Sequence, residues 1–143
     1  FAGATVYFDE ARTWHFATTA FYEMHTKKRN TDIRVGDILT LEGGLGKSFL
    51  GGTLIVGASY YAQFQIAHDE VGPDIEPLLK GRKLARQRVF GVGPELTIPI
   101  MTSNTLYGFL NARFFWEMGA RSTLEGTTLT ITATFPIPSL PLE

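Results

Sequence analysis

The sequence predicts an all-β fold, an antiparallel up-and-down meander that forms part of a transmembrane β-barrel. The first observation is the alternation in residues 52–67, where even positions are apolar throughout and odd positions are mostly small or polar, with Ile55 the main exception. A period of two is typical of a β-strand. At about 3.3 Å per residue, this strand can cross a bilayer at a steep tilt. The other two observations are that the alternation recurs along the chain and that long and short connections take turns between the strands.

The chain begins with the end of a strand, residues 1–8, whose beginning we expect to be missing. The first full strand is predicted at 13–26, where the even positions carry Trp14, Phe16, Thr18, Ala20, Tyr22 and Met24. A charged loop, 27–32, separates it from a strand at 33–48, whose odd positions include Val35, Leu39, Leu41 and Leu45. Asp37 also falls on the apolar parity of 33–48 and does not fit this interpretation.

The remaining strands are predicted at 52–67, 86–100, 106–118 and 127–135. Two prolines in 86–100 each remove a hydrogen-bond donor from its ladder. In 127–135 every position on the polar parity is threonine, and the Pro-rich segment that follows cannot extend the sheet. Residues 1–143 therefore form a single β-barrel domain. We expect it to be incomplete, because six full strands are fewer than the eight with which closed single-chain barrels begin.

The connections between these strands alternate in length. They are long at 27–32, 68–85 and 119–126 and short at 49–51 and 101–104, as in outer-membrane barrels, whose periplasmic turns are short and whose extracellular loops are longer. Aromatic residues of the apolar parity gather at both strand ends and resemble the girdles of a membrane barrel. The alternative left open is a soluble β-sandwich or ligand-binding barrel, in which the apolar parity would point inward.

Composition excludes several functions. The net charge of -1 gives no basic field for nucleic acid, and the absence of cysteine removes disulfides, thiolate metal sites and Cys nucleophiles. Residues 43–48 end like a phosphate-binding loop, but Leu41 stands where that motif needs its first glycine. His15 and His25 lie about 33 Å apart on one strand and cannot bind one ion. We expect no catalytic residues, no metal, no cofactor and no enzyme activity.

Four segments together resemble a known family. They are G-D-I-L-T-L-E-G-G-L-G-K-S-F (36–49), G-V-G-P-E-L-T-I-P-I (91–100), F-W-E-M-G-A-R-S-T-L-E-G (115–126) and I-T-A-T-F-P-I-P-S-L-P-L (131–142). The chain resembles the C-terminal portion of the Putative MetA-pathway of phenol degradation family. The resemblance implies a β-barrel in the outer membrane of Gram-negative bacteria and a part in handling aromatic or other hydrophobic compounds. It supplies no catalytic residues.

Two groups of residues are candidate sites. Lumen-lining positions near mid-depth are predicted to be Glu42, Ser59, Tyr61, Glu95, Asn111 and Arg113. Counting from the turns places Glu95 opposite Asn111 with Arg113 on the diagonal, a pairing within reach. If these charged side chains pair with one another, they would fill the lumen; if they are hydrated, they would line a passage through it. The filled lumen is favoured.

The second group lies at the long-loop end on the outward parity. Arg86 and Arg88, close to Lys80, Arg82 and Lys83, are predicted to face lipopolysaccharide, because Arg forms charge-assisted bonds with phosphate. A solvated basic loop is the other interpretation.

The expected function is passive passage of small hydrophobic or aromatic molecules across the bacterial outer membrane. A non-conducting structural or partner-binding barrel and a soluble ligand-binding barrel are the alternatives. The expected partners are membrane lipid, lipopolysaccharide and a small solute. An open sheet would leave backbone groups unsatisfied in lipid. We therefore expect N-terminal strands outside this chain, or further copies of it, to complete the barrel.

Overall fold

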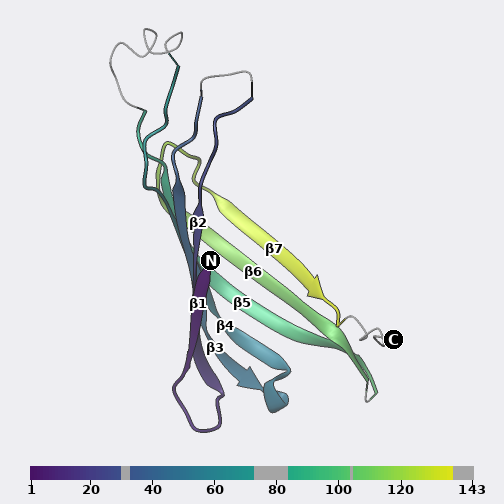
Figure 1. Ribbon diagram of the computed structural model, residues 1–143. Coiled ribbons are helices and arrows are strands. Elements are labelled where there is room, and N and C mark those ends of the chain that lie inside the picture. Colours follow the sequence, from purple (N-terminus) through teal and green to yellow (C-terminus); the bar gives the residue numbers. More distant parts are fainter. Residues whose placement is uncertain (30–32, 73–83, 104, 137–143) are drawn as a thin grey trace.

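The computed structural model describes residues 1–29, 33–72, 84–103 and 105–136. They form one antiparallel sheet of seven strands in the order β1-β2-β3-β4-β5-β6-β7 (Figure 1). The strands are β1 (Ala2–Tyr7), β2 (Trp14–Glu23), β3 (Ile38–Phe49), β4 (Leu54–Gln65), β5 (Arg88–Thr102), β6 (Thr105–Arg121) and β7 (Thr127–Thr134). Each strand pairs with its sequence neighbours, which confirms the predicted all-β, up-and-down meander.

The sheet is open over the described part of the chain. β1 pairs with β2 alone and β7 with β6 alone, so one edge of each lacks a neighbour. An open meander with two free edges is what a segment of a barrel would show. The one helical element among these residues is a 3-10 turn, η1 (Leu50–Gly52), and no helix there is long and apolar enough to span a membrane.

The β1–β2, β3–β4 and β5–β6 connections lie at one end of the sheet, and the other three connections lie at the opposite end (Figure 1). The turn between β3 and β4 contains Gly51 and Gly52, whose φ angles of 69° and 92° suit residues without a Cβ. The connections from β2 to β3 and from β4 to β5 extend from the opposite end. The two longest connections therefore lie at the same end of the sheet, whereas the β6–β7 connection is shorter than the predicted 119–126 because β6 continues to Arg121.

Several strand bounds differ from the sequence prediction; for example, β2 ends at Glu23 instead of residue 26, and β6 ends at Arg121 instead of residue 118. β3 begins at Ile38 instead of residue 33, because residues 33–37 run through a loop held by side chains, described below. β5 extends to Thr102 and β6 begins at Thr105, so the turn between them is tighter than the predicted 101–104. The pairing of the two strands also has a register shift between Ile100 and Met101.

The sheet has two chemically different faces. We call one the polar face; it carries the odd-numbered residues of β2, β4 and β5, those of β6 between its two register shifts, and the even-numbered residues of β3 and β7. We call the opposite one the apolar face, and beyond the register shift of β6 it includes Arg121, the partner of Arg88. In β5, Gly91 and Gly93 on the polar face are buried, whereas Val92, Leu96 and Ile98 on the apolar face are 38–44% exposed. The large apolar side chains of this strand therefore point away from the protein.

Charge follows the same division. Every carboxylate within the seven strands lies on the polar face, as does Arg113. The charged residues on the apolar face are Lys47, near the short-turn end, and Arg88 and Arg121, at the long-loop end. The apolar face of the strands is thus uncharged between its two ends.

Candidate functional site on the polar face of the sheet

All six predicted lumen-lining residues lie on the polar face, but the structure divides them into separate groups. Glu95, Asn111 and Arg113 form one hydrogen-bonded cluster across β5 and β6. Tyr61 reaches from β4 toward β6, and Ser59 is buried beside it in β4. Glu42 stands apart on β3.

The first cluster centres on the Glu95 carboxylate. Its Oε1 atom accepts hydrogen bonds from Arg113 Nε at 3.1 Å and from Asn111 Nδ2 at 2.7 Å. Asn111 Nδ2 also donates to Thr97 Oγ1 at 2.8 Å. The side chains of Arg113 and Glu95 are 39% and 17% exposed, so the ion pair is partly shielded from solvent. Such a cluster rigidifies the wall of the sheet and places a compensated charge pair on its polar face.

The predicted register between β5 and β6 was wrong by two residues in this cluster. Arg113 lies directly opposite Glu95, and Asn111 lies opposite Thr97, whereas the sequence placed Asn111 opposite Glu95. The cause is the tighter turn between β5 and β6 together with the register shift beside it. The predicted pairing of Glu95 with Arg113 nevertheless forms, because both positions are within reach of one carboxylate.

The second cluster joins β4, β6 and β7. Tyr61 Oη and Thr128 Oγ1 each donate to Glu117 Oε1 at 2.7 Å. The Tyr61 ring packs edge-to-face on Phe115, with 5.1 Å between centroids, and it crosses β5 above Gly91. Glu117 is not among the predicted lumen-lining residues; its polar parity is visible in the sequence, but it lies closer to the long-loop end than the mid-depth positions.

The absence of a side chain at Gly91 leaves room for the Tyr61 ring, and we expect Gly91→Ala to displace that ring. A Cβ at residue 91 would lie 2.2 Å from Tyr61 Cε1, so the ring must move and its bond to Glu117 is lost. The cost should be about 1 kcal/mol, the usual value of one such bond. Urea unfolding of the protein measures it, with Tyr61→Phe as the matched variant that loses the bond without the clash. A Gly91→Ala protein as stable as wild type would contradict this packing.

A hollow lies next to the first cluster. It has a volume of about 210 Å³, and its lining includes His15, Glu42, Glu95 and Arg113 above a floor of glycines. The Glu42 side chain forms no hydrogen bond or ion pair with any other described residue, unlike that of Glu95. Ser59 is 1% exposed, and its Oγ atom has no hydrogen-bond partner among the described residues. Within the described residues, no group of three His, Asp or Glu side chains could hold a metal ion.

The comparison with known proteins identifies the family. A family model described as "Putative MetA-pathway of phenol degradation" matches residues 2–133, which include nearly all of the seven strands and both clusters. The chain belongs to this family. The match confirms the resemblance seen in the sequence, and the family description names a pathway of phenol degradation. No curated protein and no solved structure matches the chain.

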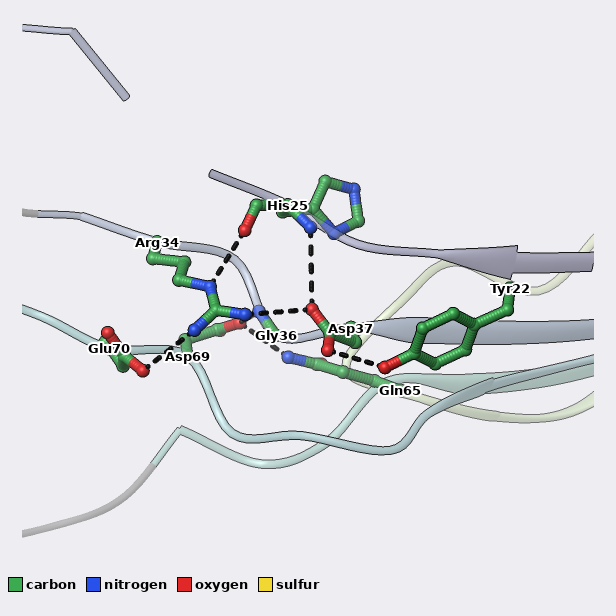
Figure 2. A network of polar contacts seen from close by, with 8 residues as sticks. All are labelled: Tyr22, His25, Arg34, Gly36, Asp37, Gln65, Asp69 and Glu70. Carbon is green, nitrogen blue, oxygen red and sulfur yellow. Dashed lines mark hydrogen bonds and ion pairs between the residues drawn. The ribbon is translucent and has the colours of Figure 1, made fainter. Parts of the chain in front are cut away.

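In this member of the phenol degradation family, the contacts of Asp37 explain why a charged residue stands on the predicted apolar parity of residues 33–48. Figure 2 shows its carboxylate between the Tyr22 hydroxyl and the Arg34 guanidinium, at the long-loop end of the sheet. The distances are 2.8 Å to Tyr22 Oη and 3.2 Å to Arg34 Nη2, and the His25 backbone N–H also donates to Asp37. Asp37 precedes β3, so its charge lies in a loop rather than on the apolar face.

The same network joins the two connections of the long-loop end. Arg34 Nη1 bonds Glu70 at 3.2 Å, and the two residues also exchange backbone hydrogen bonds. Asp69 accepts from the Gly36 N–H at 2.9 Å and from the buried Gln65 amide (Figure 2). A side chain at position 36 would meet the Ala67 carbonyl. Residues 33–37 are therefore fastened to residues 65–70.

We expect this fastening to weaken in acid. Hydrogen bonds from Tyr22 and the His25 N–H, with the charge of Arg34, lower the pKa of Asp37 below its usual 3.8. A lowered carboxylate pKa stabilises the folded loop above pH 3.8, and this contribution is lost as the pH falls through the folded value. The hydrogen-exchange protection factors of residues 33–37, which correct for the pH dependence of intrinsic exchange, should fall between pH 5 and pH 3, roughly the window of carboxylate titration. Asp37→Asn should show lower protection factors at both pH values and a smaller change; an unchanged profile would contradict this role.

The two arginines predicted to face lipopolysaccharide are both exposed. Arg88 begins β5 on the apolar face, opposite Phe64, and Arg86 lies two residues earlier in the connection. The basic residues Lys80, Arg82 and Lys83, named with them from the sequence, lie outside the described residues. Arg121 of β6 was not predicted, yet it is the direct cross-strand partner of Arg88.

Proposed function

We propose that this chain is part of a β-barrel in the bacterial outer membrane that lets small hydrophobic or aromatic molecules pass without chemical change. One observation carries the proposal: strand charges stay on the polar face, except at the two ends of the apolar face. A face of exposed aliphatic and aromatic side chains suits hydrocarbon, and a face of hydroxyls, amides and carboxylates suits a lumen. Membership of the phenol degradation family supports an aromatic solute.

The height of the apolar face fits a membrane. From Leu54 to Phe64 the strand β4 rises about 33 Å along its axis. At a tilt of roughly 40° this becomes about 25 Å, the height of the apolar band of outer-membrane barrels. At the lower end of this band, Lys47 Nζ lies 5.1 Å from the Trp14 ring centre and 5.4 Å from that of Phe49. A lysine among aromatic rings is typical of a membrane interface, where it extends its charge to water.

The polar face would form the wall of the passage. Tyr61 and Phe115 offer aromatic surface there, next to hydroxyl and carboxylate groups that could orient a solute. Selectivity would then follow from the width and lining of the lumen.

A non-conducting barrel is the second candidate. Its support is that Glu95 with Arg113, and Tyr61 with Glu117, bind each other across the polar face, as the side chains of a filled barrel do.

The free edges of β1 and β7 require partner strands in a membrane. Each unpaired backbone group costs several kcal/mol in hydrocarbon. Strands from outside this chain or from a second copy would pair with these edges and close the barrel. We expect the 143 residues alone not to remain a stable inserted monomer.

Two measurements on the full-length protein test the proposal. In vesicles of brominated phospholipid, the fluorescence of Trp14 and Trp116, which are on the apolar face, should be quenched by the acyl chains. In planar bilayers the protein should conduct ions, and aromatic solutes should block the current. Quenching without conductance would favour the non-conducting barrel. Tryptophans that brominated lipid does not quench would overturn the membrane assignment.

A further inference from the structure

Two arginines face each other at the long-loop end of the apolar face. Arg88 and Arg121 are direct partners in the ladder between β5 and β6, and both side chains are exposed. Cross-strand partners have Cβ atoms about 4.5–5.5 Å apart, and like charges in this arrangement repel. Arg86 is also exposed and lies two residues before Arg88. This end of the apolar face therefore concentrates positive charge.

No carboxylate in the described part of the chain neutralises this charge. None of the three arginine side chains forms an ion pair or hydrogen bond with another described residue. Glu125 is the acidic residue nearest to them in the β6–β7 connection, and its Oε2 atom accepts from the Ala120 backbone N–H at 3.0 Å instead. A dianionic group between Arg88 and Arg121 would convert their repulsion into charge-assisted hydrogen bonds.

The surface beside the arginines is aromatic and aliphatic. Phe64 lies opposite Arg88 on β4 and packs edge-to-face on Phe90, with 5.4 Å between ring centres. Trp116, opposite Val92, continues this surface toward the aliphatic band. The order along the apolar face is therefore cation, aromatic ring, then aliphatic chain, which matches a molecule with a phosphate head and hydrocarbon tails.

We infer that Arg88 and Arg121, with Arg86 beside them, bind the phosphate group of a lipid in the outer leaflet, such as a phosphorylated glycolipid of the lipid A class. This inference rests on the proposed membrane orientation. The paired arginines supply a fork of N–H donors for phosphate oxygens. The aromatic and aliphatic surface would hold the lipid tails and distinguish the ligand from free phosphate.

The test uses the full-length protein in nanodiscs and three probes: diphosphorylated lipid A, the same lipid without phosphate, and inorganic phosphate. Binding of each probe to the protein is measured by native mass spectrometry of the intact nanodiscs. Wild type should bind diphosphorylated lipid A at least tenfold more tightly than the dephosphorylated lipid. Removing one charge-assisted bond weakens binding roughly tenfold, so Arg88→Gln with Arg121→Gln should lose about a hundredfold. Lys47→Gln, the matched control at the other end of the apolar face, should bind as wild type does.

The outcomes separate this site from the proposed function. Brominated-lipid quenching is first measured for each variant, and it reports insertion alone. Protein that inserts but binds both lipids equally overturns the arginine site and leaves the membrane assignment standing. Protein that does not insert overturns both. If inorganic phosphate displaces the lipid at equal concentration, the ligand is free phosphate and the lipid inference is wrong.

Discussion

Ile131→Arg is expected to destabilise the inserted barrel by about 2–4 kcal/mol, the cost of an arginine facing lipid at mid-depth. Ile131 lies on the apolar face of β7 and is 62% exposed, so the new side chain meets no protein clash. Its penalty would come from hydrocarbon alone. The same substitution on a water-exposed surface should cost less than about 0.5 kcal/mol.

Thr132→Arg is the matched control for this prediction. Thr132 is the next residue of the same strand, is also exposed and lies on the polar face opposite Asn111. Its arginine would enter the lumen and change stability by less than about 1 kcal/mol. Urea unfolding of the full-length protein in lipid vesicles, followed by tryptophan fluorescence, compares the two variants. Equal effects at the two positions would show that the faces do not meet different solvents.

The sequence predicts the fold because one physical rule repeats along the chain. Period-two alternation assigns each side chain to a face, and no tertiary contact is needed to read it. The rule works at Val92 and Leu96, which are exposed on the apolar face, and at Glu42 and Glu95, which are on the polar face. It fails at Asp37, because β3 begins only at the next residue, Ile38, and parity has no meaning in a loop.

Register and long-range contacts are less accessible from the sequence. A turn shorter than expected places Arg113 instead of Asn111 opposite Glu95. Near Gly119, whose φ angle is 66°, a register shift brings Arg121 opposite Arg88. Each change inserts or removes a residue at a bulge or turn, and hydrophobic patterns do not encode that count. The arginine pair was missed for this reason.

Arg113→Ala should destabilise the barrel by about 2–3 kcal/mol. Removal of one partner from a fully buried ion pair costs roughly 3–5 kcal/mol, and the partial exposure of Arg113 lowers this value. Glu95 would keep its bond from Asn111 and lose its compensating charge. Adding Glu95→Gln should restore part of the loss, because no uncompensated charge remains, and the double-mutant cycle gives the coupling energy.

The same pair decides between an open passage and a filled barrel. If Glu95 and Arg113 obstruct the lumen, replacing both with alanine should raise the single-channel conductance of the full-length protein. Phe114→Ala is the control, because this residue lies next to Arg113 on the apolar face and outside the proposed lumen. A double variant that folds and conducts as wild type does would place the constriction elsewhere. Conductance that appears only in the double variant would show that this ion pair is what keeps the native barrel closed.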